Sequence, residues 1–147
     1  MNYLFYFLYF ALLILVYIRY HSQIILGIGS EGFSNLKNVN VKVALDKELG
    51  LMHKKTPLKP KSGLLFNYDS YGLYTFWMKN THIPLDIVCL DHNYKVVDII
   101  KKMKPHSKKN RTCNVPFKHA IEMNSGEPKK MKISIGDTIE LNYVDKI

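Results

Sequence analysis

The chain has 147 residues and carries 21 Lys and Arg against 12 Asp and Glu, a net charge of +9. This length allows one modest domain with an appendage and excludes a multidomain assembly. The positive charge favours anionic partners, but 19 of the cations are Lys, which suits bidentate recognition of bases and phosphates less well than Arg does, so the composition argues against a nucleic-acid role.

The first element in chain order is an uninterrupted apolar segment. Residues 3–18 contain no charged side chain, and a helix of that length spans about 24 Å of a hydrocarbon core of about 30 Å. We therefore expect residues 1–20 to form an N-terminal transmembrane helix, a single-pass membrane anchor with Arg19 at the interface. The alternative is a signal peptide cleaved near Ser30, which would export the remainder of the chain. The flanking charges leave the orientation of an anchor open.

A linker and then a domain follow the apolar segment. Residues 27–38 hold three Gly, two Ser and two Asn, a composition typical of flexible connections. We therefore assign residues 21–38 to a linker and residues 39–147 to a single domain. Within that domain, Val39–Leu45 alternates apolar and polar side chains as a half-buried strand does, and Asp46 is placed to cap a short helical turn at Lys47–His53.

The rest of the domain reads as short strands. A hairpin is the clearest local pattern, with strands at Leu85–Asp91 and Lys95–Met103 and a tight turn between them. Further predicted strands are Gly63–Asn67, Thr75–Met78, Ala120–Met123 and Thr138–Val144. Because no segment offers the crossover helix that usually connects parallel strands, we expect a mainly β (β-rich α+β) fold, a small antiparallel curled sheet or barrel with one or two short helices.

Residues 73–91 concentrate the side chains that suit a binding site. They contain the sole tryptophan, Trp77, beside the hydrogen-bonding Asn80, Thr81 and Asp86. A proline-stiffened corner of this kind could hold a ligand by stacking on Trp77 and hydrogen bonding to the polar side chains. The alternative is a structural corner in which Trp77 fills the core and Asn80 and Asp86 satisfy backbone N–H groups.

Glu122 completes the candidate pocket Trp77, Asn80, Thr81, Asp86 and Glu122. It lies between Ile121 and Met123, so strand alternation turns it away from both. Glu122 and Asp86 could then form a carboxylate pair for acid–base catalysis, as in a hydrolase. A Glu in a strand is more often a surface residue, and the sequence leaves both interpretations open.

A basic segment follows the predicted hairpin. Residues 101–111 hold six cations, which are Lys101, Lys102, Lys104, Lys108, Lys109 and Arg111. The segment is either a solvated loop or a membrane surface that contacts anionic lipid headgroups.

Cysteines and histidines show no metal-binding or redox pattern. Cys89 suits a buried strand and Cys113 a polar loop, and a disulfide between them is conceivable if the domain is exported. The six histidines show no pair at metal-ligand spacing, so the sequence predicts neither a metal nor another cofactor.

Four motifs carry a family resemblance. They are Gly50-Leu51-Met52, Gly63-Leu64-Leu65-Phe66, the run from Phe76 to Asp86, and Ile121-Glu122-Met123-Asn124-Ser125-Gly126. In this order the chain resembles domain-of-unknown-function family 192, also called uncharacterised protein family 0127, over about residues 39–145. The family usually has Arg where this chain has Lys54, and it favours Met where this chain has Leu64. The resemblance implies a fold, and it brings no established activity, cofactor or substrate.

These observations predict a membrane-tethered β-rich domain that binds a small ligand or acts as an accessory module. The alternatives are a hydrolase that uses Asp86 and Glu122, and a purely structural membrane-associated protein.

Overall fold

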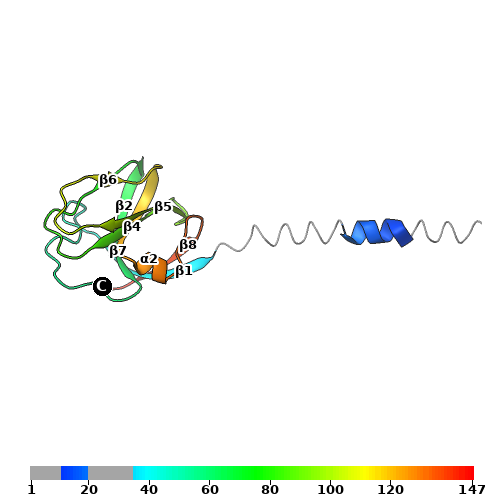
Figure 1. Cartoon of the computed structure of the whole chain (residues 1–147), viewed down its shortest axis with the longest axis horizontal. Coiled ribbons are helices and arrows are strands. Elements are labelled where there is room, and N and C mark those ends of the chain that lie inside the picture. The colour runs from blue at the N-terminus through cyan, green and yellow to red at the C-terminus, as the bar shows by residue number, and fades with distance from the viewer. Residues whose placement is uncertain (1–10, 20–34) are drawn as a thin grey trace, which may run out of the picture. The chain divides into compact units, whose positions relative to one another are not determined.

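The computed structural model in Figure 1 describes residues 11–19 and 35–147. The chain divides into two units, Met1–Ser34 and Asn35–Ile147. In the first unit, residues 11–19 form a helix. No helix in the described part of the chain has the length and apolar character needed to cross a membrane. The predicted N-terminal transmembrane helix is thus not supported, and the rest of segment 1–20, with most of the predicted linker 21–38, lies outside the described residues.

The second unit is built mainly from strands, as expected. Its elements are β1 (Leu36–Val43), β2 (Ser62–Gly72), β3 (Thr75–Phe76), β4 (Leu85–Leu90), β5 (Val96–Met103), β6 (Arg111–Thr112), β7 (Phe117–Asn124), α2 (Glu127–Lys130) and β8 (Thr138–Tyr143). Six of these strands form one sheet in the order β5-β4-β7-β2-β1-β8, and β3 pairs with β6 in a two-stranded ribbon.

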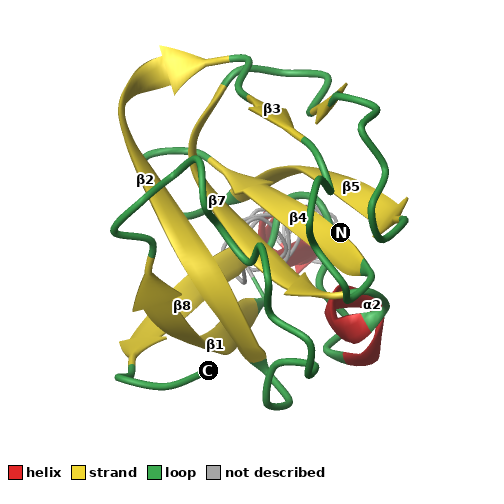
Figure 2. Ribbon diagram, turned by 90° about the vertical axis from the view of Figure 1, so that its left-hand side faces the viewer, coloured by secondary structure: helices red, strands yellow, loops and turns green. Residues whose placement is uncertain are grey.

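The large sheet curls into a half-barrel, which Figure 2 shows from β5 round to β8. Its two edge strands meet at their first residues. The Val96 N–H donates to the Asp137 carbonyl at 2.8 Å, and the Ile139 N–H donates to the Tyr94 carbonyl at 2.9 Å. These bonds satisfy backbone groups that an open edge would leave free. The prediction of a mainly β, curled fold with short helices is confirmed.

One part of the predicted topology is wrong, because the sheet is mixed and not antiparallel. Strand β1 pairs in parallel with both β2 and β8. Parallel neighbours need a crossover connection of about a dozen residues or more. Here the irregular segment 44–61 makes that connection without a regular helix. The predicted hairpin is confirmed, since β4 and β5 pair antiparallel across a tight turn.

Each face of the sheet carries its own hydrophobic cluster. Inside the curl, every strand of the large sheet contributes, from Val39 in β1 to Ile139 in β8. The opposite face is covered by loops, and residues such as Leu51, Leu58 and Met78 pack on it. Both clusters are built within the unit Asn35–Ile147, so this unit contains the burial it needs to fold by itself.

Two local features constrain the sheet, one on the face inside the curl and one on the loop-covered face. Gly63 in β2 lies so close to β7 that a Cβ atom there would come within 2.3 Å of the Ile121 side chain, so this position admits no larger residue. A disulfide joins Cys89 of β4 to Cys113 of the loop after β6. It attaches the basic segment to the centre of the sheet.

Candidate ligand-binding site

Glu122 lies at the centre of the loop-covered face. Strand β7 runs between β2 and β4, and Glu122 pairs in register with Leu64 on one side and Ile87 on the other. Strand alternation directs its side chain away from Ile121 and Met123, as predicted. The side chain is only 7% exposed, so the expectation of a surface Glu is wrong. Leu51 belongs to the same buried cluster as Leu64 and Ile87. Leu51 and Met52 also line one cavity together with Glu122.

The Glu122 carboxyl group is incompletely satisfied. Its Oε2 atom is buried and has no hydrogen-bond partner among the described residues. Burial raises the pKa of Glu122 to about 7, although a hydrogen bond with the Leu51 backbone acts in the opposite direction. An unpaired buried acceptor costs free energy, and a native structure that retains one calls for an explanation.

A cavity of about 430 Å³ opens beside this carboxyl group. Its lining combines four aromatic rings with polar groups, and includes Phe66, Tyr68, Phe76, Trp77, Thr81, Glu122 and, from the covering segment, Lys47, Glu48 and Gly50. This volume lies in the range of small-molecule sites, which are mostly apolar with a few convergent polar groups. We call it the Glu122 pocket.

Gly50 leaves room for the carboxyl group at the edge of this pocket. Its φ angle is +48°, and a Cβ atom at this position would lie 3.2 Å from the Glu122 Oε2 atom. A side chain here would therefore be strained in its backbone and would crowd the carboxyl group. The Gly50-Leu51-Met52 motif, one of the four that carry the family resemblance, forms part of the pocket wall.

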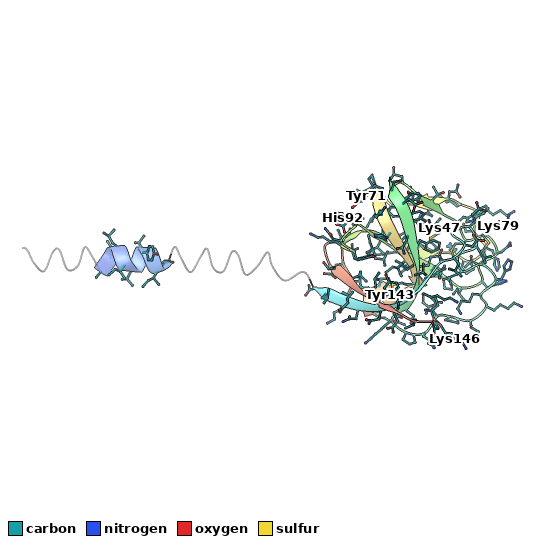
Figure 3. The ribbon with its side chains drawn as sticks, turned by 180° about the vertical axis from the view of Figure 1, so that it is seen from behind. Lys47, Tyr71, Lys79, His92, Tyr143 and Lys146 are labelled. Carbon is teal, nitrogen blue, oxygen red and sulfur yellow. A yellow bond between two sulfur atoms is a disulfide. The ribbon has the colours of Figure 1, made fainter. Side chains whose placement is uncertain are left out.

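Two lysines lie over aromatic rings that line the Glu122 pocket. The Lys47 ammonium is 5.2 Å from the centre of the Tyr68 ring, and the Lys79 ammonium is 5.1 Å from that of Trp77. Figure 3 labels both lysines. Burial and the nearby Glu122 carboxyl raise the pKa of Tyr68 to about 12, so its phenol stays protonated at neutral pH.

Asp86 lies outside the Glu122 pocket. In the β4–β7 register Asp86 pairs with Met123 while Ile87 pairs with Glu122, so the two carboxylates point to opposite faces of the sheet. Asp86 is 4% exposed. It accepts hydrogen bonds from the Lys102 N–H at 2.7 Å, the Ser125 hydroxyl at 2.9 Å and the Gly126 N–H at 2.9 Å. The hypothesis of a catalytic Asp86–Glu122 pair is therefore wrong.

Of the other three residues predicted for the candidate pocket, two line the Glu122 pocket and one does not. Trp77 is 42% exposed and lines the Glu122 pocket together with Thr81. The Asn80 side chain is exposed instead, and the residue adopts a positive φ of 56°. Its carbonyl accepts the His53 N–H at 2.8 Å. The structure thus brings together Trp77, Thr81 and Glu122, while Asn80 contributes its backbone carbonyl to the corner.

The sequence interpretation missed most of the pocket wall. Phe66 and Tyr68 come from β2 and Phe76 from β3. Phe66 and Phe76 read as ordinary strand aromatics, and Tyr68 lies beyond the predicted strand Gly63–Asn67. The one signal was Gly50, whose motif is shared with the family. The six cations of the basic segment are exposed, in keeping with either interpretation of that segment.

Comparison with known proteins identifies the family. The family model described as DUF192, Uncharacterized ACR, matches residues 31–141. The chain belongs to domain-of-unknown-function family 192. The predicted resemblance is thereby confirmed, and the family is itself uncharacterised.

Two solved structures are similar to this family member. A proposed transcription regulator from Sinorhizobium meliloti 1021 has 31% identity and a TM-score of 0.63, over 67% of this chain and 78% of that chain. A protein of unknown function from Novosphingobium aromaticivorans DSM 12444 has 28% identity and a TM-score of 0.60, over 70% of each chain. None of the curated proteins matches the chain.

Proposed function

We propose that the domain is a small-ligand-binding module and that the Glu122 pocket is its binding site. The observation that carries the proposal is the unpartnered Oε2 atom of Glu122 at a cavity walled by aromatic rings. A ligand that hydrogen-bonds to this atom would remove the cost of leaving it buried and unpaired. Asp86 and Glu122 point to opposite faces of the sheet, so they do not form the carboxylate pair on which the hydrolase alternative depends.

The lining indicates the chemistry of the ligand. Phe66, Tyr68, Phe76 and Trp77 offer flat apolar surfaces, which suit an aromatic ring or the apolar face of a sugar. The Glu122 carboxyl group requires a hydrogen-bond donor on the ligand, such as an amine, amide or hydroxyl group. The ligand is therefore a small cyclic molecule with a hydrogen-bond donor at one edge.

We further propose that this module is held at a membrane by residues 3–18, the uncharged apolar segment. The Cys89–Cys113 disulfide supports placement of the domain in an oxidising compartment. The same compartment would follow if the segment were instead a signal peptide cleaved near Ser30. The exposed cations of residues 101–111 would then face anionic headgroups at the membrane surface.

Fluorescence of the fragment 35–147 tests the binding proposal. Trp77 is the only tryptophan and lines the pocket, so its emission reports directly on occupancy. We expect members of a library of aromatic amines, amides and monosaccharides to shift this emission and to raise the melting temperature. The substitution Glu122→Gln should weaken the binding of such compounds by about tenfold or more, because a buried charge-assisted bond is lost.

The matched control is Glu140→Gln, which makes the same chemical change at an exposed position of β8. This variant should bind with unchanged affinity. Equal affinities for the wild-type fragment and the Glu122→Gln variant would place the bound compound elsewhere and would refute the proposal.

A further inference from the structure

A second cavity lies among the cations of the basic segment. It has a volume of about 310 Å³, and its lining is Met78, Lys102, Met103, Lys104, Ser107, Lys109 and Arg111. Four of these seven residues are cationic and none is acidic. We call this cavity the basic pocket. It is distinct from the Glu122 pocket, because no residue lines both.

No salt bridge joins a cation of the basic pocket to an acidic side chain in the described part of the chain. Among the described residues, the one salt bridge joins Lys130 to Glu127, and neither residue lines the basic pocket. Gathering four positive charges around one cavity raises the free energy of the empty pocket, because like charges repel each other. A bound anion would remove this repulsion, and Arg111 with the three lysines would supply charge-assisted hydrogen bonds.

Backbone hydrogen bonds fix the wall of the basic pocket. The Met78 N–H donates to the Ser107 carbonyl at 2.9 Å, and the His106 N–H donates to the Thr81 carbonyl at 3.1 Å. Arg111 is held in β6, where it pairs with Phe76 of β3. These bonds fix the backbone of the pocket wall, while the four cationic side chains that line the pocket are exposed.

Ser107 contributes a hydroxyl group as well as backbone contacts. Its Oγ atom accepts the Lys109 N–H at 3.3 Å, which leaves the hydroxyl proton available as a donor. Tetrahedral oxyanions accept several hydrogen bonds, and the fork of an Arg guanidinium matches two of their oxygen atoms. The lining therefore matches phosphate more closely than it matches a halide.

We propose that the basic pocket is a specific phosphate-binding site, which takes a phosphate monoester or inorganic phosphate. This goes beyond a general attraction of the basic segment to membranes, because it assigns binding to four of its six cations. Lys101 and Lys108 do not line the pocket. The phosphate group comes either from a lipid headgroup such as phosphatidic acid or from a soluble phosphate, and the chemistry of recognition is the same.

Titration of the fragment 35–147 with inorganic phosphate at constant ionic strength tests this assignment. We expect saturable changes in the amide NMR signals of residues 102–111. The paired substitution Lys104→Gln with Arg111→Gln should weaken phosphate binding by about tenfold or more. The matched control, Lys101→Gln with Lys108→Gln, removes the same charge from the same segment and should change the affinity by less than about twofold.

Vesicles that contain phosphatidic acid distinguish the two sources of the phosphate. If the pocket takes a lipid headgroup, the fragment sediments with these vesicles and inorganic phosphate releases it. If the source is soluble, phosphate binds while the vesicles do not retain the fragment. Both results support the site. The proposal is overturned if phosphate gives no saturable change, or if both paired variants weaken binding equally.

Discussion

For Glu122, the sequence predicted the direction of the side chain but not its burial. Alternation along β7 predicts the direction of its side chain, because that direction depends only on neighbours in the chain. Its burial depends on segment 44–61, which folds over the sheet from a distant part of the sequence. No local pattern carries that information, and a Glu between two apolar residues reads as a surface position.

The raised pKa of Glu122 predicts how stability depends on pH. The folded pKa is about 7 against a usual value of 4.5, so the folded state holds this proton more tightly than the unfolded state. This contribution to stability is fully present below about pH 4.5, and it is lost as the pH rises to about 7. The total loss should be roughly 3 kcal/mol, at about 1.4 kcal/mol per pKa unit.

Chemical unfolding between pH 4 and pH 8 measures this loss, with Glu122→Gln as the test variant. The neutral amide does not titrate, so the variant should lose the part of the slope that belongs to this residue. Glu140→Gln should keep the wild-type slope. An identical pH dependence in Glu122→Gln and the wild type would show that Glu122 does not titrate with a raised pKa.

Asp86 gives a second prediction at this scale. Its three hydrogen bonds come from two backbone N–H groups and one hydroxyl. Asp86→Asn replaces one acceptor oxygen by an NH2 group that faces a donor, and it should reduce the free energy of unfolding by roughly 1–3 kcal/mol. Asp69→Asn, at an exposed position of β2, should change it by less than about 0.5 kcal/mol. Urea unfolding measures both, and unchanged stability in Asp86→Asn would contradict the structural role.

At the scale of elements, the sequence predicted the pairing of strands that are adjacent in the chain, but not the pairing of distant strands. The hairpin of β4 and β5 was predictable because its strands are adjacent in sequence and a tight turn joins them. The parallel pairing of β1 with β2 and β8 was not, since an irregular crossover gives no periodic signal. Likewise, β2 extends through residues 68–72, beyond the predicted strand Gly63–Asn67.

The Cys89–Cys113 disulfide joins the loop after β6 to β4. The two cysteines are 24 residues apart, and a loop of that length predicts a stabilisation of roughly 3 kcal/mol by chain entropy. The double substitution Cys89→Ala with Cys113→Ala should lower the free energy of unfolding by about this amount. Amides of the sheet that exchange only by global unfolding should then exchange faster by the corresponding factor. Acceleration confined to residues 104–116 would contradict the prediction, because it would show that the disulfide holds only this segment.

At the scale of the whole molecule, the apolar segment and the folded unit are predicted to act together. If residues 3–18 anchor the chain, the full-length protein should sediment with membranes, resist extraction by carbonate and retain its N-terminal residues. The fragment 35–147 should be soluble and folded, because both hydrophobic clusters lie within it. Cell fractionation and N-terminal mass spectrometry measure these outcomes. A mature N-terminus near Ser30 would contradict the anchor and would indicate a cleaved export signal.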